Sequence, residues 1–228
     1  MKTRMVLLIV LIGFVHAGCF HGEIKTNYAT DADTLVASKR PLPVVAGLVF
    51  SEEEQQRQDH VRHFGFKVRV DTGTATYELS KAWAAKLFDG TTEVQKIKPD
   101  EETNLFLKPR IEELDIRVEG FLYTYFAYLE VAGLISLEAY DSQGVSIWSG
   151  KRPVDYRSGR AVHALWLLVR RNKITTDAYK AIVLKDLSGL VNEFYYSEEL
   201  QDYLCSIGKC TRQSLEKSHP ALGAEGGP

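Results

Sequence analysis

The sequence predicts an α+β fold in which helices pack on one face of a mostly antiparallel or mixed sheet. The clearest sheet signal is a hairpin: residues 131–140 alternate in part between apolar and polar, and the turn-forming residues 141–144 follow. The helix signals are two amphipathic segments, residues 74–90 and 175–196, whose apolar residues recur at spacings of three and four. The hairpin and the two helices together indicate this fold class.

The first residues of the chain have the pattern of a targeting signal. Lys2 and Arg4 precede an unbroken apolar run over residues 5–15. That run is too short to cross a bilayer, which takes roughly 20 residues in a helix. A basic start, a short apolar stretch and the small residues Ala17 and Gly18 predict a secretory signal peptide over residues 1–18.

Cys19 follows these small residues directly, and the sequence Ala17-Gly18-Cys19 resembles the lipobox of bacterial lipoproteins. In that family the cysteine is diacylated and becomes the new N-terminus. The resemblance therefore implies that Cys19 carries lipid, palmitate for example, and anchors the protein to a membrane. His16 stands where the family has an aliphatic residue, and an ordinary signal peptide beside a free cysteine is the alternative. In enterobacterial lipoproteins an aspartate directly after the cysteine favours retention in the inner membrane. Phe20 stands at that position here, so the resemblance implies the outer membrane.

The next segment, residues 19–42, is polar and ends in two prolines, which predicts a tether with at most one edge strand. A single α+β domain is expected over residues 43–210. It opens with a buried strand at residues 43–50 and a second strand around residues 66–70. The charged residues between these strands predict a solvated turn.

The first amphipathic helix has Leu79, Trp83 and Leu87 on one face. Thr76 is the expected N-cap, and Gly90 the expected C-terminal stop. A short strand is expected over residues 92–98. A further strand begins at Leu105 and has Pro109 near its end, which predicts an edge position.

After the hairpin, residues 158–173 predict either a helix capped by Ser158 or a buried strand, and periodicity does not decide between them. The second amphipathic helix presents an apolar stripe on one face, and residues 197–205 add a short helical piece. A disordered tail is expected over residues 211–228. The stripe comprises Tyr179, Ile182, Val183, Leu187, Leu190, Val191 and Phe194.

The chain has three cysteines, and lipidation of Cys19 leaves Cys205 and Cys210 as a pair. An even remainder in a secreted protein predicts a disulfide. The closed loop is short, so the bond is expected to add about 2 kcal/mol, mainly locally. A metal-binding or redox pair is the alternative, but neither a second cysteine pair nor the C-x-x-C spacing supports it.

Composition and motifs argue against several activities. The formal net charge of −2 and the lack of a clustered basic stretch do not favour nucleic-acid binding. His60 and His63 have a helical metal-site spacing, but they fall in a predicted strand, where such residues point to opposite faces. The acid groups at residues 52–54 and 112–113 are expected to be solvated. No G-x-S-x-G nucleophile motif is present, and no cofactor or metal is expected.

The order of parts also resembles a broad class of bacterial outer-membrane lipoproteins. A lipobox and tether lead to residues 43–55, then to the first helix, residues 104–116, the hairpin turn and a closing helix. The class includes the lipopolysaccharide-assembly lipoprotein and the lipoproteins of curli and exopolysaccharide export. Its members serve as plugs, scaffolds or export-complex parts, so the resemblance implies a protein that is not an enzyme.

These patterns predict a periplasm-facing accessory or binding protein of an envelope assembly or export machine, attached to the membrane through Cys19. The expected partner is another envelope protein, and no nucleic-acid partner is expected. The sequence does not decide whether the protein forms an oligomer. The aromatic stretch at residues 121–128 offers Tyr123, Tyr125 and Tyr128 for partner contact, unless it packs on both sides. The alternatives are a lipid- or glycan-binding lipoprotein and a periplasmic hydrolase.

Overall fold

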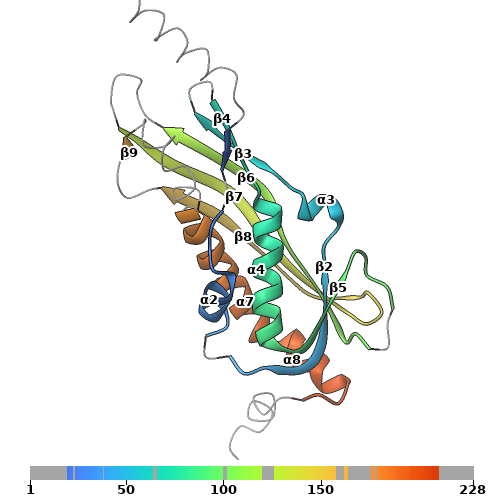
Figure 1. Cartoon of the computed structure of the whole chain (residues 1–228). Coiled ribbons are helices and arrows are strands. Elements are labelled where there is room, and N and C mark those ends of the chain that lie inside the picture. The colour runs from blue at the N-terminus through green and yellow to red at the C-terminus, as the bar shows by residue number, and fades with distance from the viewer. Residues whose placement is uncertain are drawn as a thin grey trace, which may run out of the picture.

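The computed structural model of the chain describes residues 20–22, 24–37, 39–63, 66–99, 102–119, 126–157, 162–163, 176–177 and 179–210. These residues form an elongated mixed sheet with its main helices on one face (Figure 1). The predicted fold class is therefore confirmed. The expected signal peptide and C-terminal tail lie outside the described residues, as does most of the ambiguous segment 161–169.

The elements follow one another in a fixed order along the chain. They are β1 (Phe20–Gly22), α2 (Tyr28–Leu35), β2 (Leu42–Val49), α3 (Glu52–Gln55), β3 (Asp59–His63), β4 (Phe66–Val70), α4 (Thr72–Leu87), β5 (Phe88–Val94), β6 (Leu105–Glu119), β7 (Phe126–Asp141), β8 (Ser146–Arg157), β9 (Val162–His163), the π-helix η1 (Lys180–Leu184), α7 (Lys185–Tyr195) and α8 (Glu198–Ser206).

Strand β6 organises the sheet. On one flank it pairs in an antiparallel manner with β7, from Leu105 opposite Asp141 to Glu119 opposite Tyr128. β7 pairs in turn with β8 through the predicted hairpin. On its other flank β6 pairs in parallel with β2 and then with β3. β5 lies beyond β2, and β4 and β1 lie beyond β3, so parallel and antiparallel pairs occur in one sheet.

The core lies between the sheet and helices α2, α4 and α7. Trp83 and Leu79 of α4 are fully or almost fully buried, as the helical periodicity predicts. Phe194 of α7 packs with its ring centroid 5.5 Å from that of Trp148 on β8. The stripe predicted for the closing helix is buried at Tyr179, Val183, Leu187, Leu190, Val191 and Phe194. Among the described residues, no helix is long and apolar enough to cross a membrane.

The predicted boundaries of α4 are wrong at both ends. Its N-cap is Asp71, so Thr76 lies inside the helix, where its hydroxyl donates to the carbonyl of Thr72 at 2.8 Å. Its C-terminus is at Leu87, and the chain enters β5 at once, with Gly90 inside that strand. The helix ends without a glycine stop because the next residue, Phe88, is already buried in an extended conformation.

The predicted tether is also corrected. Its residues 28–35 form α2, whose N-cap Asn27 accepts from the amide of Thr30. Ala32 and Leu35 are fully buried, and α2 packs on α4. Burial of this apolar face stabilises the helix on the domain, so α2 belongs to the domain although its sequence reads as polar.

Pro109 does not lie on an edge strand, because β6 has strands on both sides. Pairing with β2 ends at Leu107, however, and pairing with β3 begins at Ile116. No described strand pairs with residues 108–115 on this flank. We call this stretch the ladder gap. Pro109 thus lies at a local edge inside the sheet, which a sequence pattern cannot distinguish from an outer edge.

Candidate functional site

The ladder gap is partly covered by α3, whose N-cap residue Ser51 forms a capping box with Glu54. The Ser51 hydroxyl accepts from the amide of Glu54 at 3.2 Å, and the Glu54 carboxylate accepts from the amide of Ser51 at 2.8 Å. Gly73 of α4 lies against this turn. A Cβ atom at Gly73 would come within 2.2 Å of the Glu54 carbonyl oxygen, so the close approach of α3 and α4 requires glycine here.

Arg57 supplies the donors that a neighbouring strand would otherwise supply. Its Nη1 donates to the β6 carbonyl of Ile111 and to that of Glu112, the latter at 3.2 Å. Its Nε and Nη2 bond to the two carboxylate oxygens of Asp59 at 3.2 and 3.1 Å. The hydroxyl of Thr72 also donates to Asp59. The guanidinium is therefore held in place while it satisfies strand carbonyls in the gap.

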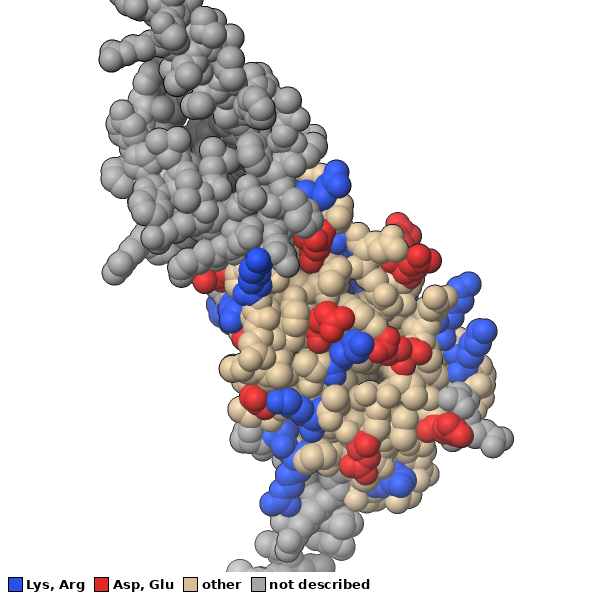
Figure 2. All heavy atoms as spheres, viewed as in Figure 1, with Lys and Arg blue, Asp and Glu red and all other residues tan. Residues whose placement is uncertain are grey.

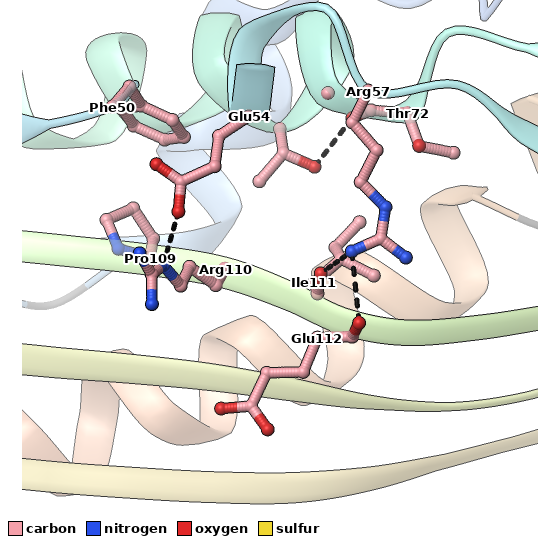
Figure 3. Close-up of a pocket in the computed structure, with 10 residues that line it drawn as sticks. Phe50, Glu54, Arg57, Thr72, Pro109, Arg110, Ile111 and Glu112 are labelled. Atoms are coloured by element: carbon pink, nitrogen blue, oxygen red, sulfur yellow. Dashed lines mark hydrogen bonds and ion pairs between the residues drawn. The ribbon is translucent and has the colours of Figure 1, made fainter. Parts of the chain in front are cut away.

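The gap opens into a cavity of about 350 Å³ between α3, the start of α4 and β6 (Figure 3). Glu54 and Arg110 face each other across it and form an ion pair. Glu112 pairs with Lys151 of β8 at 2.8 Å. The lining residues are Phe50, Glu54, Arg57, Thr72, Gly73, Thr76, Pro109, Arg110, Ile111 and Glu112.

The carboxylates of this cavity are stabilised in their charged forms. Burial acts to raise the pKa of Glu54, but hydrogen bonds from Ser51 and the charge of Arg110 outweigh it, so that pKa is lowered. The hydrogen bond from Lys151 lowers the pKa of Glu112. Neither carboxyl is thus prepared to act as a general acid near neutral pH.

Charges of both signs are interspersed on the face of the molecule seen in Figure 2. In the cavity lining each charged side chain has an oppositely charged partner: Arg57 has Asp59, Arg110 has Glu54, and Glu112 has Lys151. The lining contains no histidine or cysteine. This arrangement suits the binding of a polar group, or the support of the sheet, better than proton transfer.

A second, more open cavity of about 730 Å³ lies where the segment after β1 meets α4. Lys180 approaches it from η1 and pairs with Asp31 of α2 at 3.3 Å. Its lining residues are Ile24, Lys25, Thr26, Asn27, Tyr28, Asp71, Thr74, Ala75 and Lys180. This cavity is likewise lined by charged and polar groups as well as apolar ones.

The residues singled out in the sequence do not converge on one site. Cys19, Tyr123 and Tyr125 lie outside the described residues. Tyr128 is 37% exposed on β7, with the guanidinium of Arg157 stacked 4.8 Å from its ring centroid. Cys205, in the last turn of α8, and Cys210, beyond the end of that helix, form a disulfide, as their pairing in the sequence predicts.

His60 and His63 lie in β3, a strand as expected. Among the described residues, no group of three or more His, Cys, Asp or Glu side chains is placed to hold a metal ion. Glu52, Glu53 and Glu113 are exposed, as expected of solvated acids. Glu54 and Glu112 differ from that expectation, because each forms an ion pair at the gap. The capping-box pattern Ser51-x-x-Glu54 was readable in the sequence and could have located α3, whereas nothing near Arg57 in sequence predicts its partners on β6.

No protein-family model matches the chain, and no curated protein sequence matches it. The chain is similar to solved structures that include the following three. A neuraminyllactose-binding hemagglutinin homolog from Helicobacter pylori is 12% identical, covers 76% of this chain and 94% of its own, and has a TM-score of 0.42. A protein from Xanthomonas campestris is 9% identical, with coverages of 75% and 98% and a TM-score of 0.35.

The third similar structure is a minor lipoprotein from Acinetobacter baumannii, 11% identical, with coverages of 68% and 92% and a TM-score of 0.32. Identities and TM-scores this low carry no argument about function.

Proposed function

We propose that this protein is a lipid-anchored binding protein of the bacterial envelope, facing the periplasm from the outer membrane, and that it works without covalent chemistry. Its role would be that of an accessory part of an assembly or export machine. The observation that carries the proposal is the place of Cys19 in the sequence, directly after the predicted signal peptide and directly before the first strand, β1. Diacylation at one such cysteine anchors a water-soluble domain firmly.

The disulfide supports an oxidising compartment. It joins Cys205 and Cys210, so Cys19 is the one cysteine left for modification. Disulfides persist in the periplasm and are rare in the reducing cytosol. The signal sequence, the lipobox and the disulfide therefore agree with one another, although they are separated by almost the whole chain.

The cavities support binding rather than hydrolysis. At the ladder gap, Glu54 and Glu112 are held as carboxylates by Arg110 and Lys151. Since a glycosidase acid needs a raised pKa, these carboxylates do not fit that role. Both cavities described above are lined by charged groups, which does not favour carriage of an acyl chain. An envelope protein partner remains the proposed ligand.

The anchoring is tested with Cys19→Ala in cells fed a labelled fatty acid. We expect the label to be lost and the protein to leave the membrane fraction, because no acyl chain can then be attached. Cys205→Ser is the matched control, which should keep both label and anchoring. A Cys19→Ala protein that is still labelled would contradict the proposal. Crosslinking in intact envelopes, followed by mass spectrometry of the captured proteins, tests for the partner.

A further inference from the structure

The position of β1 determines how the proposed anchor meets the domain. β1 pairs in parallel with β4, from Phe20 opposite Val68 to Gly22 opposite Val70. The chain therefore enters the sheet at Phe20, one residue after Cys19. Consecutive Cα atoms are about 3.8 Å apart, so an acylated Cys19 has no tether between it and the sheet.

The other strands show which end of the sheet this is. β3 and β4 meet near it at His63 opposite Phe66. The last β6–β7 pair, Glu119 opposite Tyr128, lies at the same end, as does Arg157 of β8. We call this the β1 end. In Figure 1 it is the upper end, near the labels β4 and β9, whereas α8 lies at the lower end.

Basic residues cross the sheet close to the β1 end. The strand registers align five charged residues in one transverse row, of which four are basic: Lys67 of β4, Arg62 of β3, Arg117 of β6, Glu130 of β7 and Arg157 of β8. Glu130 pairs with Arg157, and Asp115 pairs with Arg117. The side chains of Arg117 and Arg157 are nevertheless 61% exposed.

Exposed ion pairs of this kind are weak, so Arg117 and Arg157 can exchange their partners for lipid phosphates. Tyr128 adds an exposed aromatic ring beneath Arg157. The side chains of tyrosine and arginine each combine an apolar body with a polar or charged end. Such side chains suit the region of lipid headgroups. Each basic residue close to an anionic membrane surface adds about 1 kcal/mol of attraction, and the neighbouring acids Glu130 and Asp115 offset part of this attraction.

We propose that the β1 end is a membrane-contact surface, at which the side chains of Arg117 and Arg157 and the ring of Tyr128 lie against lipid headgroups. The proposal rests on the lipid anchor proposed above, and names the surface that the anchor presses onto the bilayer. The long strands then extend away from the membrane. The β7–β8 turn, with Val145, and the end of α8 are left distant and available to a protein partner.

The test uses the acylated full chain in vesicles of phosphatidylethanolamine and phosphatidylglycerol. With Cys19 acylated and Cys205 bonded to Cys210, an introduced cysteine is the one free thiol. Tyr128→Cys and Val145→Cys place it at opposite ends of β7, and Val145 is 62% exposed in the turn. At about 3.4 Å per residue the two positions differ by roughly 40 Å along the strand.

Each variant carries a donor fluorophore, and the vesicles carry an acceptor on their headgroups. We expect energy transfer at position 128 to exceed that at position 145 by at least about fivefold, given the roughly 40 Å separation. A flexible glycine-serine linker inserted between Cys19 and Phe20 should lower transfer at position 128 severalfold. Equal transfer at the two positions, or a linker without effect, would overturn the membrane-contact surface.

These outcomes are separable from failure of the anchor itself. If Cys19 is not acylated, neither labelled variant sediments with the vesicles, and both proposals fall. If both variants sediment but transfer is equal, the anchor stands and the membrane-contact surface does not. Far-ultraviolet circular dichroism of each labelled variant confirms that the domain is still folded.

Discussion

The two flanks of β6 differ in how the hydrogen-bonding groups of the strand backbone find partners. Towards β7, backbone pairing runs from one end of the strand to the other with a single register shift between Ile111 and Glu113, and apolar residues such as Ile135 and Leu137 are buried beside it. Towards β2 and β3 the pairing is interrupted, and Arg57 bonds to the strand carbonyls instead. The continuous flank depends on apolar burial and the interrupted flank on a few polar contacts. The cavity lies on the interrupted flank because a side chain fills less space than a strand.

The largest effect should come from the continuous flank. Leu137 is fully buried opposite Pro109, so Leu137→Ala leaves a void in the core. We expect a loss of about 2–5 kcal/mol in the free energy of unfolding, measured by urea denaturation of the unacylated domain. Val145→Ala, at an exposed position, is the control and should change stability by less than about 0.5 kcal/mol. Equal stabilities for the two variants would contradict this account of the flank.

An intermediate effect is expected at the interrupted flank. Arg57→Met keeps an unbranched but shorter side chain and removes its donors, which leaves the carbonyls of Ile111 and Glu112 and the carboxylate of Asp59 without them. We expect a loss of about 1–3 kcal/mol in the free energy of unfolding. Arg117→Met is the matched control, because the side chain of Arg117 is 61% exposed and its pair with Asp115 is a surface ion pair, a kind that contributes little to stability. If both arginine variants unfold alike, Arg57 does not replace a strand in the ladder.

The smallest effect concerns pH. The pKa of Glu54 is lowered in the folded protein from its usual 4.5, so the unfolded chain binds the proton more tightly. The stabilisation by charged Glu54 is therefore present above about pH 4.5 and is lost as pH falls through the lower folded pKa. Glu54→Gln should be less stable than the wild type at pH 7, and the difference should shrink towards pH 3.

Urea denaturation at several pH values measures this difference. Glu53→Gln, at an exposed position of the same short helix, is the control and should follow the wild type throughout. A constant difference between wild type and Glu54→Gln over the whole range would show that its charge does not act at the gap.

Features determined by short stretches of chain were predictable. The β7–β8 hairpin depends on Asp141, whose carboxylate accepts from the amides of Gln143 and Val145, and on Gly144, whose φ of +82° favours glycine. The buried stripe of η1 and α7 follows from helical spacing alone. The disulfide follows from the pairing of Cys205 with Cys210 in a short loop. In each of these three features the interacting residues lie close together in the sequence.

Features that need distant partners were not predictable. Residues 28–35 read as polar tether, and only packing on α4 makes α2 part of the domain. Thr76 has the chemistry of a cap, but burial of the preceding turn starts α4 earlier. Arg57 bonds to β6 across 54 positions of sequence, and no local pattern encodes that contact.

The sequence by itself thus determined the fold class, the hairpin, the closing helix, the cysteine pair and the expectation of a lipidated Cys19, because local spacing and side-chain chemistry suffice for each. The tertiary structure alone decided the interruption of the ladder, the cavity beside it and the entry of the chain at the β1 end. These depend on which strands become neighbours, and that choice is made by burial of the whole core rather than by any one segment.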